Sequence, residues 1–546
     1  MASPLSILKN IVNLNHMHVE SCEECCIPVR KFGQIAMQKQ IHIHARPYLR
    51  EQCLCPICHK KCIRDGHKHP SESWWRAPDL NGIPVFIFYR PQRIYCEEHG
   101  ALNEYIPWAD GDSRFTAEFN NEVAWLVCQM NKTAIAAYLG INWRTVGNCI
   151  QAAHQRIEPD VSERLHGLRR ICVDETSYGV GHQYITVVYD MDRNRVVWVH
   201  DKHGRDVFEM FCKQLTPEER EKIEIVAGDG ARWIDSCVKD FLPNAIRCVD
   251  FFHVTEWANE ALDKVRIATA GKAVKEYERR KAELAEAEKQ AAEAADAIRQ
   301  NRISAEEELS RMPNRGRPSR RKKELLAFLA ETAPTEEAAA KDARRPGRPA
   351  KERLSEEHQE LLDSLWKDVS AVRGAKHALG HNPENRTSNQ NDTVKLIENS
   401  YPDLYKALQM KEGLRLTLHM KDHEQAAAAL SQWIDDAGSC NLQPMVKLSE
   451  KIQRHYDNII NAIAYRVNSA KSESTNTTIK TLIKMARGFR NLDNMTALIY
   501  LKCSDLVIPL NNRIQPSAEF LAKQRDAANA RRRAREEEKR MQIAAA

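Results

Sequence analysis

Three acidic residues stand in local settings that favour metal chemistry. Asp174 and Asp229 lie in RICVDETSYG and IEIVAGDGARW, where each ends or follows a β-branched apolar run typical of a buried strand. Glu473 lies in RVNSAKSESTNTTIK, whose polar spacing indicates a helix. Carboxylates gathered on a sheet repel one another unless Mg²⁺ or a shared proton neutralises them. The trio therefore predicts a nuclease site for two Mg²⁺ ions, which could activate an attacking hydroxyl and stabilise the leaving oxygen of a phosphodiester.

The helix expected around Glu473 carries two further polar residues. Asn476 and Lys480 follow at successive offsets of three and four, so they share one helical face with Glu473. That face could offer one carboxylate to a metal ion and one ammonium group to a DNA phosphate.

A second set of candidate ligands lies near the N-terminus. The sequence holds two paired-ligand knuckles, Cys55-Pro-Ile-Cys58 and Cys96-Glu-Glu-His99, separated by an apparent β-hairpin. Their spacing predicts one tetrahedral Zn²⁺ bound by three thiolates and one imidazole. Ordinary thiols or a redox pair are the alternative. Individual ligand positions could also be filled by close neighbours, namely Cys53, His59 and Cys62.

The segment TAIAAYLGINWRTVGNCIQAA has the pattern of a helix-turn-helix. Ala136 is small enough for two helices to cross closely, and Gly140 supplies the turn. Val146 and Cys149 would face the core from the second helix. A purely structural helical hairpin is the alternative. If the segment binds DNA, five exposed positions would face a groove: Asn142, Trp143, Arg144, Thr145 and Asn148.

Residues 168–253 have the pattern of a mixed α/β core. Three successive strands are expected in RRICVDETSYG, QYITVVYDMD and RVVWVHD. A helix from Gly204 to about Leu215, strand IEIVAGD, helix ARWIDSCVKDFL and strand AIRCVDFFH follow. This order is typical of an RNase H-like fold, in which Asp174 and Asp229 would lie side by side.

Residues 267 to about 455 interrupt this core. The run KAVKEYERRKAELAEAEKQAAEAADAIRQ has few large apolar residues and predicts a long solvated helix. Arg315 and Arg317 flank a glycine as in an AT-hook, which can lie in a narrow A·T-rich minor groove. A charged flexible linker is the alternative. Residues 355–466 return to helical spacing, with Trp366 and Trp433 as expected core residues.

Length and composition set the broad class. At 546 residues and a net charge of +6, the chain is long enough for three or more domains and only mildly basic. No apolar run approaches the roughly 20 residues that cross a bilayer, so we expect a soluble intracellular protein. Several of the 16 cysteines lie in apolar stretches, as reduced core thiols do. Three closely spaced ones without an obvious second pair are also expected to be core or loop thiols: Cys22, Cys25 and Cys26.

Taken together, these motifs resemble the DDE transposases of the bacterial insertion-sequence family called ISL-three. The resemblance covers nearly the whole chain apart from the enlarged insertion and the two ends. CPIC and QRIYCEEH stand where the family has its two zinc knuckles, although the family's second knuckle normally ends in Cys and this one ends in His99. Asp174, followed by Glu175, and Asp229 correspond to the first two catalytic aspartates.

The same resemblance assigns the downstream motifs. FLPNAIRCVDFFHVTEWANEALDKVR resembles the family stretch that contains Asp-x-x-His, matched here by Asp250 and His253. These two residues could position the insertion or flipped DNA bases, or merely pack a helix start. The third acid corresponds to Glu473, in a helix that also supplies Ser469, Asn476 and Lys480. The long interval before Glu473 exceeds a bare RNase H-like core and fits one with an inserted helical domain.

The resemblance implies an enzyme that cuts DNA at the ends of its own mobile element and joins the freed 3′-hydroxyls to a target. Asp174, Asp229 and Glu473 would bind two Mg²⁺ ions, and the knuckles one structural Zn²⁺. The expected partners are double-stranded DNA, as terminal inverted repeats and target, and further copies of the chain in a dimer or larger assembly. The expected location is the cytoplasm, at the nucleoid, without a membrane. A zinc-finger and helix-turn-helix regulator with an inactive core, or an RNase H-like nuclease without strand transfer, are the alternatives.

The expected architecture is multidomain α/β plus α. Its parts are a zinc-binding domain at 1–110, a helix-turn-helix domain at 111–165, the first part of an RNase H-like core at 166–266, a helical insertion with a basic linker at 267–455, the core helix with the third acid at 456–510 and a basic charged tail at 511–546.

Overall fold

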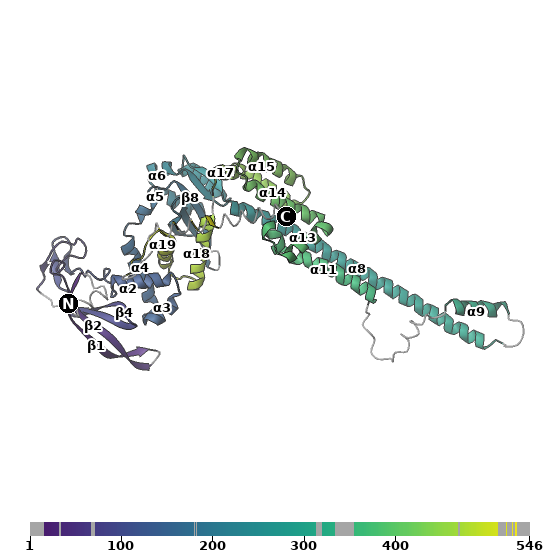
Figure 1. Ribbon diagram of the computed structural model, residues 1–546, viewed down its shortest axis with the longest axis horizontal. Coiled ribbons are helices and arrows are strands. Elements are labelled where there is room, and N and C mark those ends of the chain that lie inside the picture. The colour runs from purple at the N-terminus through teal and green to yellow at the C-terminus, as the bar shows by residue number, and fades with distance from the viewer. Residues whose placement is uncertain are drawn as a thin grey trace. The chain divides into compact units, whose positions relative to one another are not determined.

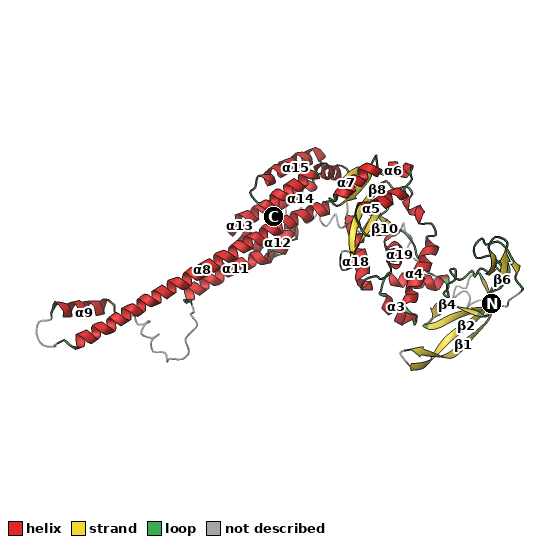
Figure 2. Ribbon diagram, turned by 180° about the vertical axis from the view of Figure 1, so that it is seen from behind, coloured by secondary structure: helices red, strands yellow, loops and turns green. Residues whose placement is uncertain are grey.

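The computed structural model describes residues 16–31, 34–66, 71–179, 181, 183–312, 319–332, 354–467 and 470–510, with isolated positions beyond 519. The chain divides into two compact units. The first comprises Met1–Val254, Leu418–Ala427 and His455–Ala546, and the second comprises Thr255–Thr417 and Ala428–Arg454. Every described strand belongs to the first unit, whereas the described elements of the second are helical (Figures 1 and 2).

The first unit begins with two small sheets. Strand order is β1-β2-β5-β4 in the larger sheet and β3-β6-β7 in the smaller one. Ile43, Trp75 and Val85 are buried in the core of the larger sheet. The alternation of apolar and polar residues in IAMQKQIHIHARPYL predicts a strand, and β2 confirms it. Strand β1 was not expected, because its cysteines and charges obscure the alternation. The bounds are β1 (Met17–Lys31), β2 (Gln34–Pro47), β3 (Ile63–Arg64), β4 (Ser73–Leu80), β5 (Ile83–Tyr89), β6 (Arg93–Cys96) and β7 (Gly100–Asn103).

The predicted helix-turn-helix is present as α3 (Lys132–Leu139) and α4 (Trp143–Ile157), preceded by α2 (Ala117–Val127). Gly140 ends α3 with a φ of 66°, a left-handed conformation that glycine adopts without a Cβ penalty. Val146 and Cys149 are buried, as the sequence predicts.

A five-stranded sheet forms the core of the first unit, in the order β10-β9-β8-β11-β12. β8, β9 and β10 are antiparallel neighbours, while β11 runs parallel to both β8 and β12. The predicted succession of strands and helices is confirmed, with one additional short helix, α6. The bounds are η1 (Val161–Leu165), β8 (Arg170–Gly179), β9 (Gln183–Asp190), β10 (Arg195–Asp201), α5 (Arg205–Gln214), α6 (Pro217–Lys222), β11 (Ile225–Gly228), α7 (Arg232–Phe241) and β12 (Ile246–Val249).

The last core strand is shorter than the sequence suggested. We expected AIRCVDFFH to be one strand, but β12 ends at Val249 and helix α8 begins at Phe251. The Asp250 carboxylate accepts a hydrogen bond of 2.9 Å from the backbone N–H of Phe252. Such a local bond offers the backbone an alternative to the strand and favours a helix start.

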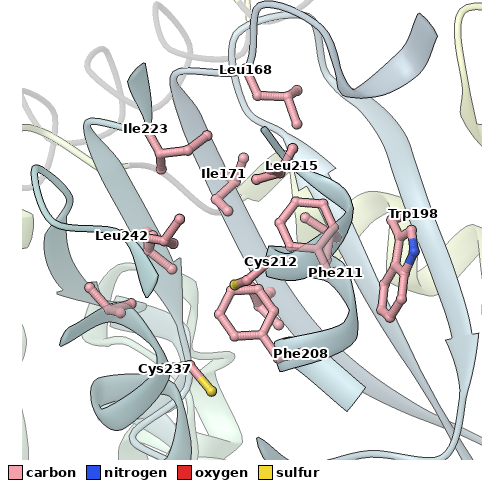
Figure 3. Close-up of a cluster of buried hydrophobic side chains, with 14 of the residues drawn as sticks. Leu168, Ile171, Trp198, Phe208, Phe211, Cys212, Leu215, Ile223, Cys237 and Leu242 are labelled. Carbon is pink, nitrogen blue, oxygen red and sulfur yellow. The ribbon is translucent and has the colours of Figure 1, made fainter. Parts of the chain in front are cut away.

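Helices cover both faces of the sheet. On one face, α5 packs through Phe208, Phe211 and Cys212 against strand residues that include Ile171 and Trp198 (Figure 3). Helix α7 contributes Cys237 to the same core. The opposite face is covered by helices from the C-terminal part of the chain, with a core that includes Cys172, Tyr189 and Ile479. These helices are α17 (Tyr456–Ala464), α18 (Ala470–Ala486) and α19 (Leu492–Cys503).

The second unit contains most of the predicted long helix α8 (Phe251–Ser310). Trp433 is buried and its Nε1 donates to the Met410 carbonyl oxygen at 2.8 Å, as expected of a core residue. The prediction that Trp366 lies in the core is wrong, since this residue is 39% exposed. The remaining helices are α9 (Arg320–Glu331), α11 (Glu356–Gly374), α12 (Lys376–Gly380), η2 (Pro383–Asn385), α13 (Ser388–Ser400), α14 (Pro402–Leu418), α15 (His423–Gly438) and α16 (Gln443–Arg454).

Among the described residues, no helix combines the length and the apolar character needed to cross a membrane.

Candidate functional site

Three aspartates form one row across adjacent parallel strands. The register pairs Gly228 of β11 with Val173 of β8 on one side and with Val249 of β12 on the other. The next residue on each chain segment is an aspartate: Asp174, Asp229 and Asp250. We call this row the acidic edge. Parallel strands bring their carboxyl-terminal ends to the same side of a sheet, which is where ligands bind in open α/β sheets.

Asn476 connects helix α18 to the acidic edge. Its Nδ2 donates a hydrogen bond to Oδ2 of Asp174, and its Oδ1 accepts from the hydroxyls of Tyr189 and Thr176. Asn476 and Tyr189 are both buried, so these bonds form away from water and hold α18 against the sheet. Glu473 lies on the same helix, three positions before Asn476, and is exposed.

The surroundings of Asp174 shift the pKa of its carboxyl in both directions. Burial raises the pKa of Asp174, and the negative charges of Asp229 and Asp250 raise it further. The charge of His253 and the Glu175 backbone N–H, which donates to Asp174 Oδ1 at 2.7 Å, oppose this shift. Asp250 and His253 therefore belong to the same electrostatic environment as Asp174.

The three predicted metal-binding acids are not drawn into a tight cluster. Within the described part of the chain, the groups whose ligand atoms all lie within 4.8 Å of one another are Cys55, Cys58, Cys96 and His99, and Glu23, Cys25 and His42. Asp174, Asp229 and Glu473 are not among them. Ionised carboxylates repel one another, so close approach requires a positive charge between them.

Several residues of this site escaped the sequence analysis. Arg247 is buried and donates from Nη2 to the backbone oxygen of Asp229 and from Nε to Asp235 at 2.9 Å. It therefore fixes the loop that carries the second aspartate. Tyr189 fixes Asn476 in the same manner. For Arg247 the available signal was a single charged side chain within the otherwise apolar strand β12, whereas the sequence of β9 does not single out Tyr189.

Glu175 turns toward the loop after β10 instead of joining the acidic edge as a ligand. Its Oε1 accepts from the backbone N–H of Gly204 at 3.2 Å, and its Oε2 lies 3.6 Å from Nδ1 of His203. Burial raises the pKa of the Glu175 carboxyl, with His203 opposing the rise.

Comparison with known proteins identifies the family. A family model described as a transposase, of the DDE group named ISL3, matches residues 171–499, and a second, described as the helix-turn-helix domain of transposase family ISL3, matches residues 104–154. The chain belongs to the ISL3 transposase family. The transposase is 32% identical over 451 residues to the transposase for insertion sequence element IS1557 of Mycobacterium tuberculosis, covering 81% of this chain and 85% of that protein. It is also 28% identical over 226 residues to the transposase for insertion sequence element IS1001 of Bordetella parapertussis, covering 40% of this chain and 53% of that protein.

The helix-turn-helix of the transposase is fixed to helix α19. Gln151 of α4 donates to the Asn494 side chain at 3.1 Å, and a Cβ added at Gly147 would lie 2.6 Å from Asn494 Nδ2. Gly147 therefore permits the close crossing of α4 and α19. One side of the predicted recognition helix is consequently covered.

The remaining side of α4 is open at its N-terminal end. Trp143, Arg144 and Asn148 are exposed, while Thr145 is half-buried. Asn142 is also exposed, but its side chain accepts from the Arg144 backbone N–H at 2.8 Å and so caps the helix.

The zinc-knuckle residues come together as their spacing predicts. Cys55 Sγ and Cys96 Sγ lie 3.6 Å and 3.5 Å from His99 Nδ1, and Cys58 Sγ lies 3.7 Å from Cys96 Sγ. Tetrahedral Zn²⁺ with ordinary bond lengths separates two sulfurs by about 3.8 Å and a sulfur from a nitrogen by about 3.6 Å. The four residues, which we call the knuckle site, therefore fit zinc without rearrangement.

The alternative knuckle ligands are engaged elsewhere. Cys53 Sγ accepts from Arg64 Nε at 3.5 Å, and Cys62 Sγ donates to the Lys60 carbonyl oxygen at 3.3 Å. The His59 ring packs edge-on against Tyr105, with ring centroids 4.7 Å apart.

The other predicted contact residues are only partly described. Lys480 is exposed on α18, beyond Asn476. Arg315 and Arg317 of the AT-hook-like segment, and Ser469 of the third-acid motif, lie outside the described residues.

Proposed function

We propose that this transposase cuts DNA at the ends of its own insertion sequence and joins the freed 3′-hydroxyls to target DNA by a DDE mechanism. Asp174, Asp229 and Glu473 are the proposed ligands of two Mg²⁺ ions. The hydrogen bond from Asn476 to Asp174 carries this assignment, because it brings the helix of Glu473 to the strands of both aspartates. The strand order, with β11 parallel to β8 beside an antiparallel trio, supports an RNase H-like core.

The chain's own residues orient the reacting groups. When bound, the two Mg²⁺ ions supply an activated hydroxyl and a stabilised leaving oxygen. Asp174 accepts from the Glu175 backbone with one oxygen and from Asn476 with the other, so its carboxylate has a fixed orientation. Lys480, two turns after Glu473, offers an exposed ammonium group to the DNA backbone.

DNA recognition is assigned to the helix-turn-helix and its surroundings. Trp143, Arg144, Thr145 and Asn148 are the proposed groove-facing residues of α4. Backbone contacts would position the duplex, whereas these side chains would read its bases. We also propose that Arg315 and Arg317 contact the minor groove of the DNA.

The knuckle site is the proposed site of one structural Zn²⁺. Its ligands come from the loop before β3 and from the end of β6 and the turn after it, so a shared ion would tie these segments together. The proposed partners are double-stranded DNA, as terminal inverted repeats and target, and a second copy of the chain, because two element ends must be paired. Such a protein would act at the nucleoid in the cytoplasm. Measuring the mass of the protein with and without end DNA tests the dimer.

The decisive experiment compares wild type with Asp174→Asn on DNA that carries the element's ends, with Mg²⁺ present. We expect the variant to bind the DNA and to lose both hydrolysis and joining, because it keeps the side-chain size but removes a charge from the cation site. Asp192→Asn is the matched control, since Asp192 pairs with Arg170 at the surface away from the acidic edge. Cleavage by Asp174→Asn at the wild-type rate would refute the assignment.

A further inference from the structure

A second cluster of ligand-type side chains lies in the N-terminal region, apart from the knuckle site. Glu23, Cys25 and His42 place one ligand atom each within 4.8 Å of one another. They belong to β1 and β2, whereas the knuckle ligands surround the separate sheet of β3, β6 and β7. From its sequence context, Cys25 was expected to be an ordinary core or loop thiol.

Strand geometry explains why these three side chains meet. Glu23 and Cys25 are two positions apart on β1 and so point to the same face of the strand. The register places His42 directly opposite Glu23, and Gln40 opposite Cys25. Adjacent cross-strand side chains have Cβ atoms about 5 Å apart, which is close enough for three ligands to share one ion.

His42 is held in an orientation that suits metal binding. Its Nε2 lies 3.1 Å from Oε1 of the buried Gln40 side chain, so when Nε2 carries the proton and donates to this oxygen, Nδ1 keeps the lone pair that can bind a metal ion. Its ring packs on Phe88 with centroids 4.6 Å apart. Metal-binding histidines usually make such a hydrogen bond with their second nitrogen, because it fixes the tautomer and the ring orientation.

A fourth ligand is within reach. His44 follows two positions after His42 on the same strand face, and its Nε2 lies 3.9 Å from Oε1 of Glu23. One thiolate, one or two imidazoles and one carboxylate form a ligand set suited to Zn²⁺, whereas Mg²⁺ and Ca²⁺ prefer oxygen ligands alone.

The cluster lies where the pairing between β2 and β5 ends. β2 pairs with β5 only from Ile41 to His44, so within the described strands the residues from Gln34 to Gln40 pair with β1 alone. β1 and β2 thus continue as a two-stranded ribbon beyond β4 and β5 (Figure 1). An isolated two-stranded ribbon is marginally stable in water.

We propose that a second zinc site is formed by Glu23, Cys25 and His42, with His44 as the fourth ligand. It would stabilise the two-stranded ribbon at the end that joins the four-stranded sheet. The ion would cross-link β1 to β2 at the position where the support of β5 ends. This inference stands independently of the catalytic assignment and of the knuckle site.

The test is the zinc content of the full-length protein, loaded with Zn²⁺ under reducing conditions, freed of loose metal and measured by mass spectrometry. Cys25→Ser and His42→Ala are each expected to lose one zinc equivalent per chain relative to wild type. Cys26→Ser is the matched control, because Cys26 is an exposed neighbouring thiol that the strand alternation directs to the opposite face. It is expected to keep the wild-type zinc content.

The knuckle variant Cys58→Ser separates the two sites. It is expected to lose one equivalent by itself, and the double variant Cys58→Ser/Cys25→Ser is expected to lose two. Retention of the wild-type zinc content by either Cys25→Ser or His42→Ala would overturn the proposal, as would an equal loss in the Cys26→Ser control.

Discussion

In the knuckle site the four ligand atoms lie within 4.8 Å of one another, whereas the acids at 174, 229 and 473 come from two strands and a distant helix and are less tightly gathered. The ligands of the knuckle site are thiols and an imidazole, which can be neutral until a metal ion binds and displaces the thiol protons. The acidic edge must hold ionised carboxylates, which resist approach. Local turns can therefore bring the ligands of a structural metal site together. A catalytic site made of carboxylates needs the packing of distant elements to position groups that repel one another.

The packing that positions the three proposed catalytic acids differs from residue to residue. Asp174 and Asp229 are fixed by strand register through Val173 and Gly228. Glu473 is positioned only through its helix, which Asn476 ties to Asp174. The variants below test this contrast, beginning with the one that should change the protein most.

Removal of one knuckle ligand should have the largest effect. Cys58→Ser is expected to lose one zinc equivalent and to destabilise the N-terminal sheets, because structural zinc binding contributes on the order of 10 kcal/mol to folding of small metal domains. Zinc analysis and limited proteolysis of the N-terminal region measure both effects. Cys62→Ser is the control, and an unchanged zinc content in Cys58→Ser would show that the knuckle does not bind the ion.

Neutralising the third acid should strongly reduce activity with little effect on stability. Glu473→Gln is expected to reduce cleavage of end DNA by about 10²-fold to 10³-fold, the size of effect seen when one preorganised electrostatic group is removed. Because Glu473 is exposed, unfolding free energy should change by less than about 0.5 kcal/mol. Ser474→Ala, at an exposed neighbouring position, should retain activity. Comparable activities for the two variants would remove Glu473 from the site.

A methyl group at Gly228 should disturb the acidic edge, because Gly228 directly precedes Asp229. Its Cβ would lie 2.8 Å from the Val173 carbonyl oxygen and 3.0 Å from Ile234 Cδ1, so β8 and β11 would have to separate. Gly228→Ala is expected to destabilise the protein by about 1–3 kcal/mol and to slow cleavage. Gly271→Ala, in a helix with open space around the added carbon, should be neutral or stabilising. Urea unfolding compares them, and equal stabilities would contradict the close approach.

Loss of the Tyr189 hydroxyl should have the smallest effect. Tyr189→Phe removes a buried donor to Asn476 and is expected to cost about 1 kcal/mol. Cleavage should fall only modestly, because the Thr176 hydroxyl still lies 3.4 Å from Asn476 Oδ1. Tyr138→Phe, at a residue that is 75% exposed, serves as control. A loss of activity as severe as that of Glu473→Gln would mean that Tyr189 acts directly in the chemistry.

Much of the fold follows from local sequence patterns. Apolar runs predicted β8, β9 and β10, and Gly140 between two amphipathic segments predicted the helix-turn-helix. The pattern failed where local chemistry outweighed it, since Asp250 ends β12 and starts α8. Strand β1 was missed because its polar and thiol side chains line both faces of a ribbon that has little core to contact.

The site was less accessible from sequence than the fold. Spacing alone could nominate Asp174 and Asp229, but the row that also contains Asp250 requires the register of three strands. The roles of Tyr189 and Arg247 depend on partners far along the chain. No periodicity encodes such contacts, because they arise only when distant elements pack together.

The most direct test of the catalytic assignment is a change of metal preference at the third acid. Thiolate ligands favour softer cations than Mg²⁺, so Glu473→Cys should be inactive with Mg²⁺ and should regain cleavage of end DNA with Mn²⁺. Ser474→Cys should keep wild-type activity with both ions. Full activity of Glu473→Cys with Mg²⁺ would contradict the claim that the acids at 174, 229 and 473 share one pair of cations.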